Sequence, residues 1–409
     1  MIRFLTAGES HGPQLTAIVE GLPAGLPLDM DALNRQLARR QKGYGSGGRM
    51  KIEKDRVQLT AGYMNGRTTG APVAINLQNL DYAKWAERDI TAITTPRPGH
   101  ADLTGAIKYG YGELRLALER ASARETAVRV AVGGICKQFL ATFGIEIGSY
   151  VVSIGDAEAI PPAELSYADR FAVAESNDLR CAVETAVSNM RQQVRATMDA
   201  KDTIGGIFEV VALNVPAGLG SHVHWDRRLD SLLMWSVGSI QAIKGVEIGT
   251  AFANSRHPGS KVHDEIFLAD DGQSLVRRTN NSGGFEGGIS TGEPIIVRAA
   301  MKPIATVLNP RHSVDLATGE EAVTVYERSD FTAVPRAAVV GEAMAAITLA
   351  NALIEKLGGD SIGEMRPRFD NLRRARLDDL MMDDVSWRFK YESEWRVTGG
   401  VEPLGGKFS

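Results

Sequence analysis

Three short segments in the first half of this 409-residue chain recur, in the same order, in its second half. The matching pairs are residues 12–26 (GPQLTAIVEGLPAGL) and 205–219 (GGIFEVVALNVPAGL), 68–75 (TTGAPVAI) and 290–297 (STGEPIIV), and 119–122 (ERAS) and 327–330 (ERSD). Short matches in Gly- and Pro-rich stretches also arise by chance, but the shared order favours duplication. The repeat therefore predicts two related α+β halves that pack together, with a site between them.

Hydrophobic patterning separates strand-like segments from helical ones. Alternating or β-branched runs predict strands at residues 15–19, 57–61, 72–77, 208–215, 265–269 and 294–300. Helical spacing predicts helices at residues 30–42, 122–143, 182–200 and 339–357. No low-complexity segment separates the halves, so we expect one domain over residues 1–383, built from halves at about 1–200 and 201–360. A tail of unknown role, residues 384–409, follows.

Composition excludes several classes of protein. A formal net charge of -4 argues against nucleic acid as the main partner, although a local cationic pocket remains compatible with it. The two cysteines, Cys136 and Cys181, are far apart and lack a partner motif, which argues against a disulfide scaffold or a zinc site. We see no run approaching the ~18 apolar residues that span a bilayer and no signal peptide at the N-terminus. We therefore expect a cytoplasmic protein without a membrane partner.

Two histidines lie in turn-forming motifs, GESHGP (residues 8–13) and RPGHAD (residues 97–102). The imidazoles of His11 and His100 can carry a proton near neutral pH, as a general acid must. Arg97 could hold an anion beside His100. A structural or exposed turn histidine and a solvated arginine are the alternatives.

The motif ERASARET (residues 119–126) stands where a loop enters a predicted helix. Free backbone N–H groups and the helix dipole suit a phosphate group there. Alternatively, Ser122 is a helix N-cap with Glu125 as its capping-box partner, and both interpretations can hold together.

Cations and glycines alternate in a second candidate segment, where Arg39, Arg40 and Arg49 flank the string GYGSGG (residues 43–48). This pattern favours a loop that folds over a polyanionic ligand, although a charge run is usually a solvated helix face. It is not a Walker loop, because the Gly-Lys-Ser/Thr ending is absent.

Further candidates lie in the second half. Lys302 follows a predicted strand and could present a cation with backbone amides, and the glycine-rich residues 280–288 fit a flat or phosphorylated group or a flexible loop. Asp330 beside Arg328 is either functional or an ordinary surface ion pair. His222 and His224 could lie on one face of a strand, but no third ligand follows nearby, so we expect no metal.

Read together, these strings resemble the chorismate synthase family over residues 1–357. The matching motifs are GESHGP (8–13), RPGHADLTGAIKYG (97–110), ERASARETAVRVAVG (119–133), GLGSHVHWDR (218–227), SIQAIKGVEIG (239–249), GGISTGEPI (287–295), KPIAT (302–306) and ERSDFTAVP (327–335). Eight motifs in order, with compatible spacing, make the resemblance highly specific.

The resemblance implies a lyase that converts 5-enolpyruvylshikimate 3-phosphate to chorismate and phosphate. The reaction would be a 1,4-anti-elimination that requires reduced FMN, at the last common step of the shikimate pathway to aromatic amino acids. The implied fold packs helices between two antiparallel sheets, and the implied assembly is a homotetramer. An external reductant would supply reduced flavin, with NADPH as an indirect source, since no flavin-reductase domain is visible in the sequence.

The resemblance also assigns roles. His11 matches the histidine that protonates or stabilises the departing phosphate, His100 the one that keeps the reduced flavin correctly protonated, and Asp330 the carboxylate that works with the flavin in removing the ring proton. Ser10 and Ser122 match hydroxyls that align flavin and substrate. The substrate clamp would be Arg40, Arg49, Arg97 and Arg124. The flavin-contacting positions would be Arg120, Ala121, Ser122, Gln241, Ala242, Gly287, Lys302, Pro303, Ile304, Ala305, Thr306 and Arg328.

One position departs from the family pattern, because Ser46 stands where members commonly carry an arginine associated with substrate and NADP binding. Two other classes of function share a flavin pocket: a flavoprotein oxidoreductase and a non-catalytic flavin-binding protein. The arginine clamp and the paired histidines favour elimination from an anionic substrate over both.

Overall fold

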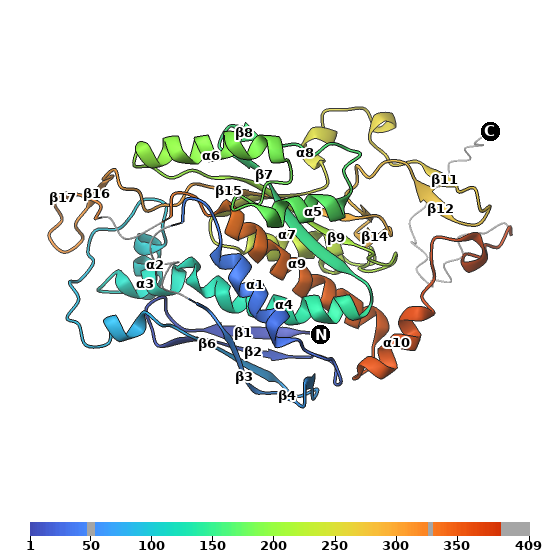
Figure 1. The fold of residues 1–409 in the computed structure, drawn as a ribbon, viewed down its shortest axis with the longest axis horizontal. Helices are drawn as coiled ribbons and strands as arrows, with labels where there is room; N and C mark the ends of the chain where they lie inside the picture. The colour runs from blue at the N-terminus through green and yellow to red at the C-terminus, as the bar shows by residue number, and fades with distance from the viewer. Residues whose placement is uncertain (47–53, 326–329, 386–409) are drawn as a thin grey trace, which may run out of the picture.

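Two long apolar helices lie side by side at the centre of the structure (Figure 1). They are α4 (Thr126–Thr142) and α9 (Val334–Leu357), and both are mostly buried. They approach so closely that a Cβ atom added to Gly133 would lie 2.3 Å from the Cβ of Ala343. Glycine at this crossing is therefore a requirement of packing, and helix α1 (Met30–Gln41) packs beside the pair.

An antiparallel sheet covers each side of this helical layer (Figure 1). The computed structural model describes residues 1–46, 54–325 and 330–385. One sheet has the order β1–β2–β6–β3, from Arg3–Ala7, Gln14–Glu20, Val73–Gln78 and Val57–Ala61. The other has the order β10–β15–β9–β7–β8, from Ile243–Ile248, Ile295–Met301, Gly206–Leu213, Glu146–Ile154 and Ala157–Glu158. The α+β class with helices between antiparallel sheets is as predicted.

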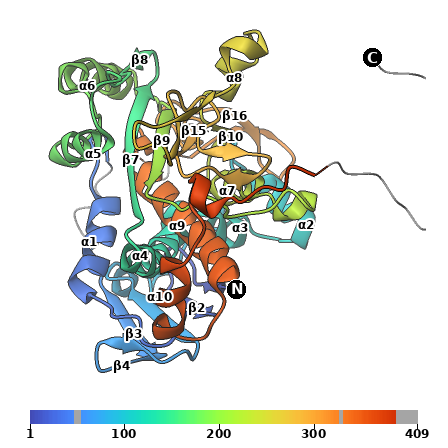
Figure 2. The same cartoon turned by 90° about the vertical axis from the view of Figure 1, so that its right-hand side faces the viewer.

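The remaining elements are short hairpins and peripheral helices. The hairpins are β4–β5 (Tyr63–Met64, Arg67–Thr68), β11–β12 (Ile266–Leu268, Leu275–Arg277), β13–β14 (Phe285–Glu286, Ile289–Ser290) and β16–β17 (His312–Val314, Glu321–Val323). The helices are α2 (Asp102–Tyr109), α3 (Arg115–Ala121), α5 (Tyr167–Ser176), α6 (Glu184–Asp199), α7 (Leu229–Gly238), α8 (Ala251–Asn254) and α10 (Ile362–Asp370). Figure 2 shows α5 and α6 on the outer side of β7 and α10 at the end of α9.

One pair of strands in each sheet has the same register. Strands β2 and β6 pair Ala17 with Ile75, and their counterparts in the sequence repeat, Val210 and Val297, pair between β9 and β15. Outside these two sheets, the Thr68 hydroxyl donates to the carbonyl of Pro23 and accepts from the N–H of Leu26. Ser290 makes the same two bonds to Pro216 and Leu219. One cluster of buried apolar side chains draws on both halves.

All six predicted strands and four predicted helices correspond to observed elements, most of them with shifted ends. Helix α9 begins at Val334, before the predicted residue 339, with Pro335 in its first turn, where the missing N–H costs nothing. Our expectation of no long apolar run is wrong for α9, which by length and composition could cross a membrane. In this fold 89% of its apolar window is buried inside the protein, the setting of a core helix.

Candidate functional site

His11 lies in the loop between β1 and β2, where α3 holds it through a single carboxylate. The Glu119 Oε2 atom accepts the backbone N–H of His11 at 2.7 Å, and Oε1 lies 2.8 Å from the ring nitrogen Nδ1. Burial would raise the pKa of Glu119, but the bonds to His11 hold it below its usual value. The ring of Trp85 covers the imidazole, with centroids 4.5 Å apart.

Ser10 and Ser122 meet beside this histidine. The hydroxyl of Ser122 donates to that of Ser10 at 3.1 Å, and the backbone N–H of Ser10 donates to the carbonyl of Glu119. Ser122 also accepts from the N–H of Arg124, so it is the predicted N-cap, at the start of the 3-10 turn Ala123–Glu125 that leads into α4. The predicted capping box is not formed, because the Glu125 carboxylate instead bonds Thr6 and other partners.

Two of the predicted clamp arginines lie at the 3-10 turn that leads into α4. Arg124, 5% exposed, forms a bidentate pair with Asp55 at 2.6 and 2.8 Å and donates to Asn79 at 2.7 and 3.0 Å. Arg40, at the end of α1, donates to the carbonyl of Ala123 and the hydroxyl of Thr126. Both guanidinium groups are thus held against the N-terminal end of α4, where the helix dipole favours anions.

His100 belongs to a second polar cluster, at the start of α2. Its Nδ1 atom lies 2.5 Å from Asp102, a fully buried carboxylate, and 3.0 Å from a terminal nitrogen of Arg97. Arg97 makes a bidentate pair with Asp102 and also donates to the Thr306 hydroxyl at 3.0 Å. Burial would raise the pKa of Asp102, but the bonds from His100 and Arg97 hold it well below its usual value.

Helices α2 and α3 connect the two histidine clusters. A Cβ atom added to Gly105 of α2 would lie 2.7 Å from the Cβ of Ala117 of α3, so the helices are in direct contact. Asp102 precedes Gly105 by one turn, and Glu119 follows Ala117 by two residues on α3. The carboxylates that hold the two imidazoles therefore lie on two packed helices.

Most of the predicted flavin positions form a continuous chain of contacts. Arg120 donates to the carbonyl and hydroxyl of Thr6, and Thr6 donates to Glu125, which also accepts from Gln241 at 3.2 Å. Ala242, with φ +67°, accepts the backbone N–H of Lys302, whose ammonium donates to the carbonyl of Gly99. Segments 120–122, 241–242 and 302–306 are thus brought together beside His100.

One buried atom in this chain supports a polar ligand. The side-chain oxygen of Gln241 is buried and has no hydrogen-bond partner among the described residues. A buried acceptor left unpaired costs free energy, so a ligand with N–H or O–H donors would be stabilised there. The isoalloxazine ring and ribityl chain of FMN carry such donors, and these residues fit that group.

The remaining predicted positions lie at the start of α9, in the β13–β14 turn, or outside the described residues. Asp330 pairs with Arg336 at the start of α9, next to the loop that follows α1, where Phe331 N–H donates to the carbonyl of Gly45. Gly287 lies in the β13–β14 turn against His222. Arg49 and Arg328 lie outside the described residues.

Sequence reasoning missed the partners of the site. Asp102 lies two residues from His100 inside one motif, and that spacing was the available signal for its role. Glu119 is also inside a motif that we singled out, but its partner His11 lies 108 positions away. Asp55 and Asn79 carried none, because only the fold brings them to Arg124. Among the described residues no group of three His, Cys, Asp or Glu side chains could hold a metal ion.

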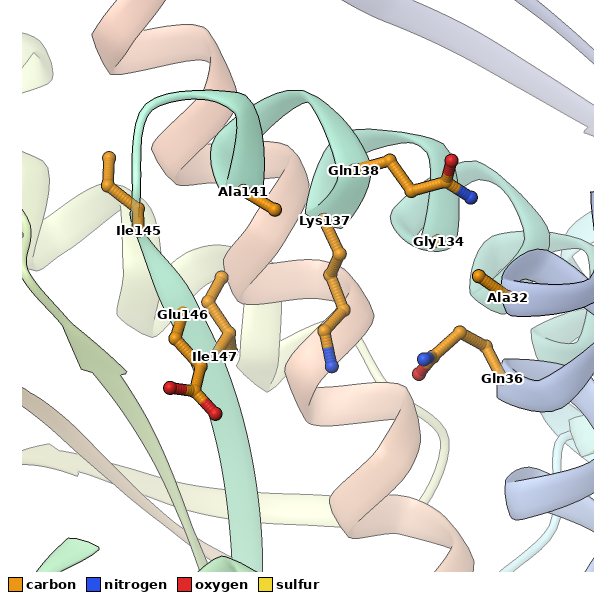
Figure 3. Close-up of a pocket in the computed structure, with 9 residues that line it drawn as sticks. All are labelled: Ala32, Gln36, Gly134, Lys137, Gln138, Ala141, Ile145, Glu146 and Ile147. Carbon is orange, nitrogen blue, oxygen red and sulfur yellow. The ribbon is translucent and has the colours of Figure 1, made fainter. Parts of the chain in front are cut away.

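A separate cavity of about 300 Å³ lies between α1, α4 and the start of β7, away from both histidine clusters (Figure 3). Lys137 projects into it, and its ammonium pairs with Glu342 of α9 at 2.6 Å. Glu342 is fully buried and also bonds Arg39 and Arg180. Burial would raise its pKa, but these three cations hold it well below its usual value.

Comparisons with known proteins agree with one another. A family model described as chorismate synthase matches residues 2–354. Chorismate synthase of Aquifex aeolicus is 51% identical over 389 residues, covering 90% of this chain and 97% of the relative. That of Pelobacter propionicus is 50% identical over 384 residues, covering 90% and 98%. A solved structure titled as the crystal structure of chorismate synthase superimposes with a TM-score of 0.75 and 44% identity, covering 90% of this chain and 96% of the other.

Proposed function

The chain belongs to the chorismate synthase family of lyases, and from that premise we propose the following reaction. The protein converts 5-enolpyruvylshikimate 3-phosphate to chorismate and phosphate by 1,4-anti-elimination in the presence of reduced FMN, in the shikimate pathway to aromatic amino acids. The observation that carries the proposal is the convergence of two carboxylate-held histidines, buried arginines and the predicted flavin segments around α2, α3 and the start of α4.

In this proposal the cationic groups bind the departing phosphate and the carboxylates of the substrate. Arg40 and Arg124 lie against the N-terminal end of α4, and Arg97 lies beside His100. Neutralising the growing charge of a leaving group with preorganised donors is often worth about 3 kcal/mol or more per donor. His11 donates a proton or hydrogen bond to the phosphate, and Ser10 and Ser122 orient the substrate. Arg49 completes the clamp and remains a prediction.

His100 and Asp330 complete the proton transfers. We assign His100 to the protonation state of the reduced flavin, because Asp102 and Arg97 fix its ring and the flavin segments adjoin it. We assign removal of the ring proton to Asp330, which Arg336 fixes at the start of α9.

Gln241, Ala242, Arg120, Ala121, Ser122 and Lys302–Thr306 would hold FMN, with Gly287 and Arg328 as further predicted contacts. Bound reduced FMN supplies an electron-rich ring that stabilises an electron-poor transition state. We propose that an external reductant, with NADPH as an indirect source, keeps it reduced. We propose that the protein acts in the cytoplasm.

We also propose a homotetramer, supported by the apolar side chains that this fold leaves exposed. The side chains of Ile107 and Tyr109 on α2 are exposed, and the exposed fraction of Trp235 on α7 is 75%. Trp225, which precedes α7 in the sequence, is exposed as well. Helices α2 and α7 lie toward the same side of the molecule in Figure 2. Large exposed apolar groups of this kind typically mark an interface with another chain.

We also propose that the fold arose by duplication of an ancestral half. It is supported by the matched strand pairs and by the matched bonds of Thr68 and Ser290. We further propose that the halves form one domain over residues 1–383.

An anaerobic assay with 5-enolpyruvylshikimate 3-phosphate and chemically reduced FMN tests the function. We expect chorismate and phosphate in equal amounts without net flavin oxidation. Net oxidation or reduction of the substrate would instead indicate a flavoprotein oxidoreductase, and FMN binding without turnover a non-catalytic protein. We expect His11→Ala and His100→Ala each to slow turnover by ~100-fold or more. Near-normal turnover in either variant would remove that residue from the mechanism.

A further inference from the structure

Glu119 uses both carboxylate oxygens on one residue. One oxygen accepts the backbone N–H of His11 at 2.7 Å, and the other lies 2.8 Å from its Nδ1 atom. The carboxylate is only 12% exposed, and Arg115 lies 3.9 Å away on the same helix. Glu119 thus holds His11 both at its backbone and at its ring, and it helps to fix the loop and the orientation of the imidazole.

The hydrogen bond between Glu119 and His11 also determines which ring nitrogen of His11 can exchange a proton with a ligand. An ionised carboxylate only accepts hydrogen bonds, and the pKa of Glu119 is lowered despite its burial, mainly by the bonds to His11. Nδ1 must therefore be the protonated nitrogen that faces Glu119. Proton exchange with a ligand is left to Nε2, as in other histidines whose second nitrogen a carboxylate orients.

Trp85 holds the imidazole from another side. The two rings are tilted by 49° with centroids 4.5 Å apart, and the indole N–H of Trp85 donates to Asp81 at 3.3 Å. The side chain of Asp81 is buried and also pairs with Lys84. An aromatic face beside a protonated imidazole stabilises its positive charge.

We propose that Glu119 is a positioning residue that directs Nε2 of His11 at the leaving phosphate and stabilises the protonated ring, with Trp85 as the second support. Charged groups near the imidazole include Glu119 and Arg115 of α3, Glu9 of its own loop, and Asp81 and Lys84 beside Trp85. Asp102 differs, because its Oδ1 atom contacts both His100 and Arg97 and its Oδ2 atom accepts from Arg97. The proposal rests on the proposed function, since it assigns a role to Glu119 only through His11.

The test is a double-mutant cycle in the full-length protein under the anaerobic assay. We expect Glu119→Gln to lower kcat by ~10–100-fold, the usual range for a lost orienting partner, with KM for the substrate changed much less. In a His11→Ala background the same substitution should cost nothing further, because its effect passes through the imidazole. Glu20→Gln, at an exposed pair with Arg3, is the matched control and should leave kcat unchanged.

A fluorescence titration provides a readout that does not need turnover. Protonated imidazole quenches a neighbouring indole, so the emission of Trp85, taken as wild type minus Trp85→Phe, should rise with pH. In Glu119→Gln this rise should move to lower pH, and in His11→Gln it should vanish.

The outcomes separate the two proposals. If wild-type protein forms no chorismate, the proposed function fails, whereas the fluorescence shift still tests the Glu119–His11 contact. If wild-type protein turns over and Glu119→Gln matches it within threefold at every pH, the positioning role is wrong. Losses in kcat that multiply in the double variant would also overturn it, because Glu119 would then act independently of His11.

Discussion

Replacement of Gly133 by alanine should separate the two central helices. The added Cβ atom would lie 2.3 Å from the Cβ, 2.4 Å from the Cα and 2.7 Å from the carbonyl oxygen of Ala343. Non-bonded carbon atoms prefer about 3.5–4.0 Å, so α9 would have to move by roughly 1 Å. The atoms that it meets belong to the helix backbone or start of a side chain, and α9 also packs on β7 and β9, so no rotamer change relieves the clash.

Two opposing effects determine how much Gly133→Ala changes the free energy of unfolding. Alanine is favoured over glycine inside a helix by about 1 kcal/mol. Overpacking of a rigid core typically costs about 1–3 kcal/mol, and backbone contacts place this case at the upper end. We therefore expect Gly133→Ala to lower the free energy of unfolding by about 2 kcal/mol.

Gly134→Ala is the matched control. Its Cβ atom would meet only the Cδ1 atom of Leu33 at 2.5 Å, the far end of a flexible side chain, with the next atom at 3.5 Å. The same gain in helix propensity applies, so its stability should stay within about 1 kcal/mol of wild type. Urea unfolding followed by far-ultraviolet circular dichroism measures both. A Gly133→Ala protein as stable as Gly134→Ala would refute the packing argument.

Two further substitutions test other parts of the structure. Glu342→Gln should lower the free energy of unfolding at pH 7 by about 3–5 kcal/mol, because it removes the buried carboxylate that three cations share. Lys137 would lose its ion pair, whereas Arg39 and Arg180 would keep theirs with Glu175. The folded-state pKa of Glu342 is lowered from 4.5, so its contribution to the free energy of unfolding is complete above that pH and should shrink as pH falls below it. A difference in urea midpoint between wild type and Glu342→Gln that stays constant from pH 7 to pH 4 would contradict this. Trp235→Asp should reduce the mass measured by light scattering, because it places a charge in the proposed subunit interface, and an unchanged mass would exclude this face.

Local patterning predicted the elements whose two faces differ. The strand at residues 57–61 was predicted with its observed ends, because its apolar and polar residues alternate. Strand β7 was missed, since eight of its nine residues are buried and the run shows no alternation. The short helices α2 and α3 were missed because few residues carry their periodicity.

Some contacts of the candidate site are also local in the sequence, and others are not. Arg97, His100 and Asp102 lie within one motif, so the chain itself brings them together. The pairing of His11 with Glu119 spans 108 positions, and that of Arg124 with Asp55 spans 69. Such contacts depend on how α3 and α4 pack against the first sheet, which no local pattern specifies.

The proposed mechanism requires both imidazoles to face the same bound substrate and flavin. A crystal structure of the protein with FMN and 5-enolpyruvylshikimate 3-phosphate tests it most directly. We predict that the Nε2 atoms of His11 and His100 face the same ligand-filled space, with the substrate phosphate near His11 and the flavin ring near His100. Imidazoles that open onto different surfaces, or a flavin bound away from residues 241–242 and 302–306, would contradict the proposed mechanism.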